Sequence, residues 1–251
     1  MQNNIAVIIL AAGMGTRMKS NKAKVLHEIT GRPMIVYVAE AARKVAGDDV
    51  IVVIGNQAQR VRGCLSECGE LIFAHQDNQL GTAHAVLCAL PHIPDHCEEV
   101  LILCGDVPLI QPETLTGLIE SHRQDGRDIS LLAVELDNPH GYGRVLLDDH
   151  QQVSGIIEEA DATAEQKANK LINAGIYFVK KGFLLEALPQ IRSDNAQGEL
   201  YLTDIMAIGY RQKKKSGVRI ADDYQQILGV NTGRDLELVG AIMKRQMRNM
   251  P

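Results

Sequence analysis

The sequence predicts an α/β protein: a three-layer sandwich with helices on both faces of a mostly parallel central sheet. The first observation is that residues 5–10, 50–54 and 100–104 are almost wholly apolar, as strands buried on both faces of a parallel sheet are. The second is that stretches of helical periodicity separate these runs. Strands that alternate with helices form right-handed βαβ units, which place helices on both sides of the sheet.

In the first half of the chain these elements alternate regularly. We predict strands at 5–10, 50–54, 71–74, 100–104 and 129–136, and helices at 33–45, 81–90 and 111–123. Proline marks the helix ends, because the first helix begins at Pro33, the second ends before Pro91, and the third has Pro112 in its first turn.

After residue 140 the alternation stops. Residues 142–159 have the pattern of a hairpin, residues 171–179 that of a further strand, and 182–188 and 203–212 that of helices. No internal repeat, low-complexity segment or Pro/Ser-rich linker divides the chain. We therefore expect one domain over residues 1–231, with a lobe from about residue 140.

Residues 232–251 have the pattern of a C-terminal helix. Thr232 and Asp235 stand at the spacing of an N-cap and the third helical residue, and basic residues follow near the end. An apolar stripe runs along this helix, formed by Leu236, Val239, Met243, Met247 and Met250. Such a helix either packs on its own domain or connects to a further one.

Composition excludes several classes of protein. The 251 residues carry a net charge of −5, so we expect no broad basic surface and no nucleic-acid partner. No apolar run is long enough to span a bilayer and no signal peptide is recognisable, so we expect no membrane partner. The five cysteines are odd in number and lack metal-binding spacing, which indicates free thiols and a cytoplasmic location.

The first 27 residues contain no acidic side chain, although acids outnumber bases in the whole chain. A turn with Gly13 and Gly15 follows the first strand, and then come the basic residues Arg17, Lys19, Lys22 and Lys24. Such a turn at the carboxyl end of a parallel strand lets backbone N–H groups approach a phosphate. The third glycine of the dinucleotide fingerprint and the P-loop motif are both missing. This segment therefore predicts a phosphate site of another kind.

These residues lead to a protein family. "LAAGMGTRM" (10–18), followed by "KVL" (24–26), resembles the L-A-A-G-x-G-x-R-M and P-K-x-L signature of sugar-nucleotide pyrophosphorylases and related nucleotidyltransferases. Ala23 replaces the usual proline, and Met14 stands where lysine is frequent. Neither change removes a required cation, because Arg17 and Lys24 remain.

Further stretches narrow the resemblance to the bacterial N-acetylglucosamine-1-phosphate uridyltransferases. "QDNQLGTAHA" (76–85) is similar to the uridine-reading loop of that family. "CGDVPLI" (104–110) is similar to its Y-G-D-V-P-L stretch, with Cys104 in place of the tyrosine. The family order continues with "GYGR" (141–144), "GIIEEAD" (155–161), "NAG" (173–175) and "GVN" (229–231).

The resemblance implies a Rossmann-like nucleotide-diphospho-sugar transferase fold and a particular reaction. UTP and N-acetylglucosamine-1-phosphate would give UDP-N-acetylglucosamine and pyrophosphate, for peptidoglycan and lipopolysaccharide precursor synthesis. Two alternatives stay open: a nucleotidyltransferase with another nucleotide or sugar phosphate, and a non-catalytic relative that binds a sugar nucleotide. The presence of Arg17, Lys24 and Asp106 favours an enzyme.

The family is usually bifunctional, with a C-terminal β-helix of hexapeptide repeats that acetylates glucosamine-1-phosphate. The present residues contain no such repeat, so we expect no acetyltransferase activity from them. An oligomer is expected only where the β-helix domain is present. Whether residues 232–251 are part of a connection to such a domain stays open.

The resemblance also implies roles for individual residues. Arg17 and Lys24 would stabilise the triphosphate as catalytic cations, and Asp106 and Asn231 would contact substrate and hold Mg²⁺. Further substrate contacts fall on Leu10, Ala11, Ala12, Gly13, Lys24, Gln76, Gly81, Thr82, Cys104 and Gly105. The sugar would be bound by Gly143, Glu158 and Asn173, with Glu159 as the neighbouring carboxylate. We expect a structural role for His84, and at Cys104 a core thiol at the end of a strand rather than a nucleophile.

Overall fold

The computed structural model describes residues 4–249, which form one nine-stranded sheet and a separate two-stranded ribbon. The main path of the sheet runs β11 (Ser216–Ile220), β7 (Ile129–Glu135), β10 (Leu171–Lys180), β6 (Glu99–Cys104), β1 (Ile5–Leu10), β4 (Val50–Ile54) and β5 (Ile72–His75). Strands β6, β1, β4 and β5 are parallel, and β11 is parallel to β7. Strand β10 is antiparallel to both of its neighbours, β6 and β7. The prediction of a mostly parallel sheet is confirmed.

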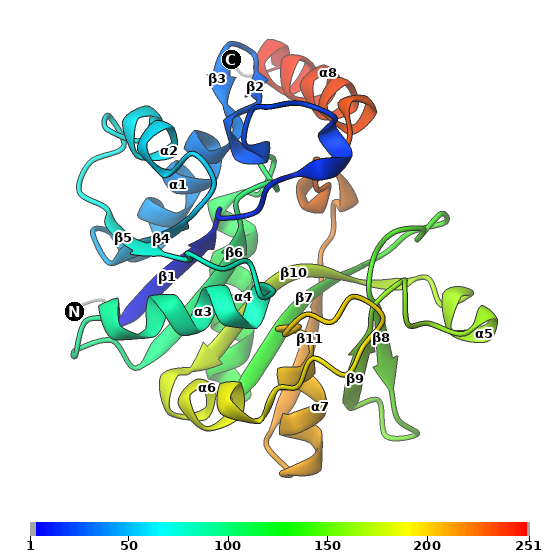
Figure 1. Cartoon of the computed structure of the whole chain (residues 1–251). Helices are drawn as coiled ribbons and strands as arrows, with labels where there is room; N and C mark the ends of the chain where they lie inside the picture. The colour runs from blue at the N-terminus through cyan, green and yellow to red at the C-terminus, as the bar shows by residue number, and fades with distance from the viewer. Residues whose placement is uncertain (1–3, 250–251) are drawn as a thin grey trace.

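Helices cover both faces of this sheet, as predicted for a three-layer sandwich (Figure 1). One hydrophobic core joins the sheet to α1 (Met34–Ala46), α2 (Ala58–Cys64), α4 (Pro112–Gln124) and α8 (Gly233–Asn249). A second core lies on the opposite face, against α3 (Thr82–Ala89), α6 (Lys181–Ala187) and α7 (Asp204–Arg211). Alternate side chains of β1 point to opposite faces, so Val7 enters the first core and Ile8 the second.

A smaller lobe extends from the sheet, at the side away from β4 and β5 (Figure 1). It contains the hairpin of β8 (Arg144–Leu147) and β9 (Val153–Ile157), and the short helix α5 (Ala164–Lys167). The hairpin joins the main sheet where Arg144 on β8 pairs with Ile172 on β10. The predicted hairpin is therefore present, with strands shorter than the limits 142–159.

The other predicted strands and helices are present, with ends that differ by about a residue. Four features were not predicted: α2, α5, β11, and the ribbon of β2 (Glu28–Ile29) and β3 (Arg32–Pro33). Pro33 belongs to this ribbon, so α1 begins at Met34 and not at Pro33. Short 3₁₀ turns that were not predicted lie at Thr16–Met18, Lys24–Leu26, Leu90–His92, Leu188–Gln190 and Tyr224–Ile227.

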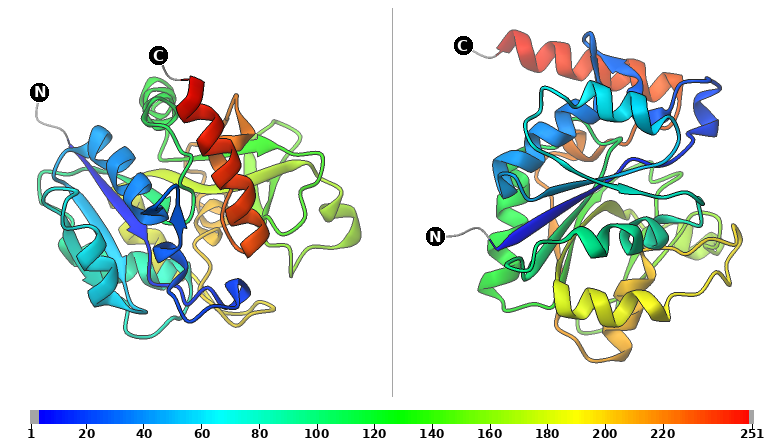
Figure 2. Two further views of the ribbon diagram at one scale, coloured as in Figure 1. Left: turned by 90° about the horizontal axis from the view of Figure 1, so that it is seen from above. Right: turned by 60° about the vertical axis from the view of Figure 1, so that its left-hand side comes forward.

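The C-terminal helix α8 packs beside the β2–β3 ribbon (Figures 1 and 2). Its predicted cap is confirmed, because Thr232 Oγ1 accepts from the Asp235 N–H at 3.2 Å. In return, Asp235 Oδ2 accepts from the Thr232 N–H at 2.8 Å. These reciprocal bonds fix where the helix begins.

The predicted apolar stripe of α8 is buried over only part of its length. Val239 and Met243 are buried, together with Ile242, which the stripe omitted. Met247 is half exposed, and Met250 lies outside the described residues. None of the described helices is long and apolar enough to cross a membrane.

Candidate active site

The glycine-rich turn after β1 permits close approach on two sides. Apart from its chain neighbours, no atom of residues 4–249 lies within 4 Å of the position that a Cβ on Gly13 would take, so the space beside Gly13 is open. Gly15 has φ +67°, and a Cβ on it would lie 2.5 Å from the Cβ of Lys24. A side chain at position 15 would therefore strain the backbone and displace Lys24. Because Gly15 has no side chain, Lys24 can pack against the turn. The open space beside Gly13 leaves room for a ligand.

Four predicted residues from distant parts of the chain meet beside this turn. Lys24 Nζ forms an ion pair with Asp106 Oδ2 and donates a hydrogen bond to Asn231 Oδ1 at 2.7 Å. Arg17 Nη2 donates to the same Asn231 oxygen at 2.8 Å. The carbonyl of Asp106 accepts from the Val230 N–H at 2.9 Å, which holds Asn231 beside the carboxyl end of β6. Two cationic side chains and two side chains with accepting oxygens therefore lie together in one small site.

The two residues predicted to hold a metal bring their side-chain oxygens to one point. Asp106 supplies a carboxylate oxygen and Asn231 an amide oxygen, and both contact the single ammonium group of Lys24. Mg²⁺ prefers hard oxygen donors and usually takes few of them from the protein, with water and substrate phosphate completing its shell. The chemistry of this donor set therefore fits Mg²⁺.

A cavity of about 430 Å³ opens over the carboxyl ends of β1 and β6. Its wall includes ten of the predicted site residues: Leu10, Ala11, Ala12, Gly13, Lys24, Gln76, Gly81, Thr82, Cys104 and Asp106. Gly105 packs between the two strands, where its N–H donates to Leu10 O at 2.9 Å and a Cβ would meet Ile35 Cδ1 at 2.8 Å. The residues predicted for the nucleotide are therefore brought together.

Gln76 is held in one orientation at this cavity. It is 4% exposed, and its Nε2 donates to Gly81 O at 3.1 Å and contacts His84 Nδ1 at 3.0 Å. Because a backbone carbonyl only accepts, the amide nitrogen must face Gly81, and both of its hydrogens are engaged. Oε1 is left as the side-chain atom that can bind a base. His84 positions Gln76, in agreement with the structural role expected for it.

Some hydrogen-bonding groups at the start of α3 are already paired with other parts of the chain. Gly81 has φ +113°, and a Cβ on it would lie 2.5 Å from Leu200 O. The Ala83 N–H donates to the same carbonyl at 2.9 Å, and Thr82 Oγ1 accepts from the Leu202 N–H at 2.9 Å. The Ala83 N–H at this helix start is therefore already paired and is not available to a substrate.

The cavity wall also contains residues that the sequence did not predict. They are Met14, Thr16, Val25, Gln79, Ala85 and Glu199, and Gly15 of the predicted phosphate turn lines the cavity with them. All but Glu199 are close neighbours of predicted residues in the chain. Glu199 comes from the loop before α7, which reaches α3 through a 2.8 Å hydrogen bond from the Leu200 N–H to Leu80 O. No local sequence pattern marks this long-range pairing, so Glu199 could not be predicted from the sequence.

The three residues predicted for the sugar form a second group on the lobe side of the sheet. A Cβ on Gly143 would lie 3.3 Å from Glu158 Oε2, so these two residues are adjacent. The Asn173 N–H donates to Gly143 O at 2.9 Å. Asn173 sits at a bulge of β10, where its Oδ1 accepts from the Gly175 N–H at 2.9 Å and its Nδ2 donates to Tyr177 OH at 2.7 Å.

Burial raises the pKa values of two side chains near this second group, Glu158 and Cys104. It raises the pKa of Glu158, and the nearby carboxylates of Asp161 and Asp204 raise it further. Burial also raises the pKa of the Cys104 thiol to about 12, with the Asp106 carboxylate adding to the effect. Cys104 Sγ donates to Gly175 O at 3.4 Å. Cys104 is therefore a protonated thiol that joins the carboxyl end of β6 to the bulge of β10.

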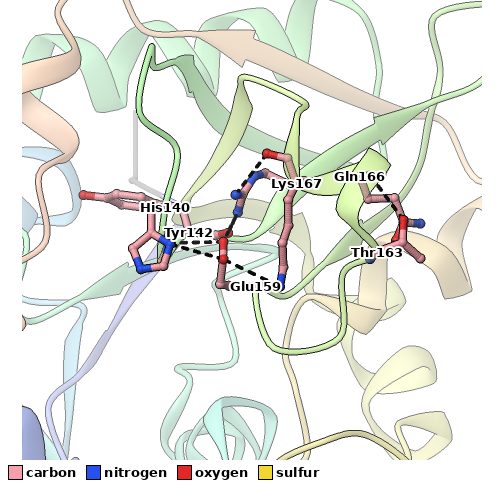
Figure 3. Close-up of polar contacts among 8 residues, drawn as sticks. His140, Tyr142, Glu159, Thr163, Gln166 and Lys167 are labelled. Atoms are coloured by element: carbon pink, nitrogen blue, oxygen red, sulfur yellow. Dashed lines mark hydrogen bonds and ion pairs between the residues drawn. The ribbon is translucent and has the colours of Figure 1, made fainter.

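Glu159 forms several ion pairs within the lobe. Figure 3 shows its carboxylate between the side chains of His140 and Lys167. Its Oε2 also pairs with Arg144 Nη1 at 2.7 Å and accepts from the Gly141 N–H at 3.2 Å. The Arg144 guanidinium beside Glu159 helps to lower the pKa of that carboxyl against the effect of burial. Glu158 is thus the carboxylate of the two that adjoins Gly143.

Arg144 extends this contact into a clamp around the loop that carries Gly143. It is 1% exposed, although it is charged. Besides Glu159, its guanidinium donates to the carbonyls of Tyr142 and Lys167. A buried cation with several acceptors is held rigidly, because losing any of them leaves its charge unsatisfied. The clamp fixes the loop on the lobe, next to Glu158.

Comparison with known proteins agrees with this geometry. Residues 7–175 match the MobA-like NTP transferase domain family. The chain is 43% identical over 244 residues to the bifunctional protein GlmU of Pelobacter propionicus, covering 97% of this chain and 53% of that one. It is 43% identical over 237 residues to the protein of the same name from Desulfotalea psychrophila, covering 94% and 70%. The chain spans about half the length of most of these relatives.

A solved structure supports the fold class. A crystal structure described as a glucose-1-phosphate thymidylyltransferase of Bacillus anthracis superposes with a TM-score of 0.75 at 18% sequence identity. The match covers 98% of this chain and 96% of the other. At this identity the likeness shows the fold alone, which confirms the predicted nucleotide-diphospho-sugar transferase architecture.

The glycine turn, the clustered cations and the matched domain together define a nucleotidyltransferase, and the chain belongs to the MobA-like NTP transferase family. Within that class it is related to the bifunctional protein GlmU, of which it spans about half. More particularly, it is a homologue of the N-terminal uridyltransferase domain of GlmU.

Proposed function

We propose that the chain transfers the uridylyl group of UTP to N-acetylglucosamine-1-phosphate, giving UDP-N-acetylglucosamine and pyrophosphate. The observation that carries this proposal is the meeting of Arg17, Lys24, Asp106 and Asn231 beside the cavity under the glycine turn. In this reaction an oxygen of the sugar phosphate attacks the α-phosphorus, and pyrophosphate leaves. Two polyanions must be brought together, so cations and rigid positioning are what the protein has to supply.

Arg17 and Lys24 have different tasks in this proposal. Arg17 has a planar guanidinium that can bind two phosphate oxygens at once, which suits the charge that moves onto the leaving pyrophosphate. Lys24 is a point charge held by Gly15 at the edge of the cavity, where it would contact the α-phosphate. Both now donate to Asn231, so both are already oriented toward the site.

Asp106 and Asn231 would hold Mg²⁺ between them. When bound, Mg²⁺ supplies charge that neutralises the phosphates and orients them for in-line displacement. Asp106 contributes a carboxylate at the end of the buried strand β6, and Asn231 an amide held by the bond between Val230 and Asp106. Lys24 Nζ contacts both of these oxygens, and its ammonium group would bind a phosphate once Asp106 and Asn231 hold the ion.

Base selection would depend on Gln76. Its Nε2 is engaged with Gly81 and His84, so Oε1 presents an acceptor to the base. The N3 position of uracil carries a hydrogen and donates, whereas N3 of cytosine accepts. An acceptor at Gln76 therefore favours UTP over CTP.

The sugar would bind at the lobe, against Gly143, Glu158 and Asn173. Gly143 has no side chain that would crowd Glu158 Oε2, which lies 3.3 Å from the position that its Cβ would take. The carboxylate of Glu158 accepts hydrogen bonds from sugar hydroxyls, and Asn173 offers an amide for the N-acetyl group. The free thiols of all five cysteines support a reducing compartment, and we place the reaction in the cytoplasm.

The test is pyrophosphate release with a panel of nucleoside triphosphates and sugar-1-phosphates in the presence of Mg²⁺. We expect UTP with N-acetylglucosamine-1-phosphate to give the highest kcat/KM. A clear preference for CTP, GTP or dTTP would overturn the base assignment. Preference for glucose-1-phosphate would overturn the sugar assignment, and no turnover with any pair would indicate a binding protein.

A further inference from the structure

A cluster of possible metal ligands lies at the edge of the sheet opposite the active site. Strands β6, β1 and β4 are parallel neighbours, so their amino ends meet at one edge. Asp49 directly precedes β4, and His96 and Cys97 lie just before β6. The candidate active site uses the carboxyl ends of the same strands.

The three side chains bring different donor atoms together. One oxygen of Asp49, one ring nitrogen of His96 and the sulfur of Cys97 all lie within 4.8 Å of one another. His96 Nε2 is 2.8 Å from Asp49 Oδ2. A tetrahedral Zn²⁺ ion binds its ligands at about 2.0–2.3 Å, so the donors in such a site are also only a few ångströms apart.

Backbone hydrogen bonds fix this arrangement. The Val7 N–H of β1 donates to Asp49 O at 2.9 Å. The Cys97 N–H donates to Pro94 O at 3.1 Å, and the next two N–H groups both donate to Asn4 O. Both ligand-bearing segments are therefore tied to the strand between them. Little further ordering is needed to bind an ion.

We propose that Asp49, His96 and Cys97 form a Zn²⁺ site, with water as the fourth ligand. A carboxylate, an imidazole and a thiolate are three ligand types that Zn²⁺ takes in proteins, and the thiolate selects against Mg²⁺. Cys97 is buried at the inner side, while His96 is exposed and leaves room for a water molecule. The carboxylate and the thiolate together carry two negative charges, which balance the two positive charges of Zn²⁺.

The same three residues do not form a nucleophilic triad. Burial and the Asp49 carboxylate raise the pKa of the Cys97 thiol to about 11, with Lys181 opposing the shift. A reactive cysteine needs the reverse, a cation or base that favours its thiolate. A bound metal ion would instead stabilise the thiolate form of Cys97. Its effect would be structural, because it would link the segments before β4 and β6 across β1.

Absorption spectroscopy of the whole chain with Co²⁺ tests this proposal. Co²⁺ replaces Zn²⁺ at such sites, and a cysteine ligand produces a sulfur-to-metal charge-transfer band that oxygen ligands do not. We expect this band at one Co²⁺ per chain in excess Mg²⁺, and its loss on adding Zn²⁺. Saturating Zn²⁺ should raise Tm by at least about 5 °C.

Variants assign the band to these residues. Cys97→Ser should abolish it, and His96→Ala, at an exposed position, should weaken Co²⁺ binding at least about tenfold. Cys88→Ser and Asp106→Asn should leave the band unchanged, because they alter another thiol and the proposed Mg²⁺ site. A band that survives in Cys97→Ser, equal binding by His96→Ala, or no band in the unaltered chain would overturn the proposal.

Discussion

Arg17 and Lys19 lie two positions apart in the same basic segment, but only Arg17 reaches the candidate site. Arg17 donates to Asn231, whereas Lys19 is exposed and makes no side-chain hydrogen bond or ion pair within residues 4–249. Arg17→Ala should lower kcat about 100-fold or more and change the KM for UTP much less, because the lost interaction strengthens in the transition state. Steady-state kinetics with varied UTP would measure both parameters.

Lys19→Ala is the matched control for this change. It removes a charge of the same sign from the same turn, so it should only reduce the rate of substrate capture, and less so at high salt. If both variants showed equal, modest losses that vanished with salt, the segment would act by general attraction. Arg17 would then have no specific role in the displacement.

Asp106 offers a second test at the scale of one residue. Asp106→Asn keeps the size of the side chain but removes one negative charge from the two proposed Mg²⁺ ligands. We expect the activity to fall about 100-fold or more and the concentration of Mg²⁺ needed for half-maximal activity to rise. Asp137→Asn, at an exposed surface ion pair, should be neutral. Normal turnover of Asp106→Asn at saturating Mg²⁺ would make Asp106 a structural turn residue.

The candidate site shows what the sequence could and could not predict about single residues. Gly13, Arg17 and Lys24 follow from one local segment, because a glycine turn and cations after a buried strand have a physical reason to bind phosphate. Asn231 is 207 positions from Lys24, and only the family resemblance placed it there. The resemblance also selected Glu158 over Glu159, and the pairing of Glu159 with the buried Arg144 now gives that selection a physical reason.

At the scale of elements, the loop that carries Gly143 depends on the clamp formed by Glu159 and Arg144. Glu159→Gln retains a hydrogen-bond acceptor but leaves the charge of Arg144 uncompensated in a buried place. The loop should loosen, so the KM for the sugar phosphate should rise about fivefold while the KM for UTP stays nearly constant. Kinetics with each substrate varied in turn would separate the two constants.

Glu186→Gln is the matched control for the clamp. Glu186 also forms an ion pair, with Lys214 at 3.0 Å, but on the surface of the protein. Exposed pairs contribute little, so this change should leave both KM values and Tm nearly unaltered. Equal increases in both KM values for Glu159→Gln would show general damage to the fold and would contradict a role in positioning the sugar loop.

The elements that the sequence reasoning missed share a lack of buried periodic residues. In β11, which is an edge strand, no residue is fully buried, so it has no apolar run. In α2 only Val61 is buried, and the helix begins after Gln57 with φ +54°. The direction of β10 could not be predicted either, because a buried strand has the same composition whichever way it runs.

At the scale of the whole molecule, His122 connects the layers on one side of the sheet. It lies on α4, where Nδ1 is 2.9 Å from Ser130 Oγ on β7 and its ring meets Phe178 of β10 edge-on, with centroids 4.8 Å apart. It is 1% exposed, and no described atom bonds its Nε2. A neutral ring fits this place, whereas an imidazolium would bring an unpaired charge into the core.

This burial makes the stability of the fold depend on pH. Burial, assisted by the charges of Lys180 and Arg127, lowers the pKa of His122 from 6.5 to about 4. Above pH 6.5 the ring is neutral in both the folded and the unfolded chain, so its contribution does not vary. Between pH 6.5 and 4 only the unfolded chain takes up the proton, so the free energy of unfolding falls as the pH falls. The loss from this residue should reach about 3 kcal/mol near pH 4.

Urea unfolding at a series of pH values measures this contribution by difference. His122→Gln keeps a hydrogen-bonding side chain but does not titrate, so its free energy of unfolding should fall less steeply between pH 6.5 and 4 than that of the natural chain. His92→Gln, at an exposed histidine, should preserve the original slope. The carboxylates titrate in all three proteins, so their effect cancels in the comparison. Parallel curves for His122→Gln and the natural chain would mean that His122 accepts its proton as readily in the folded protein, and that the core opens to water around it.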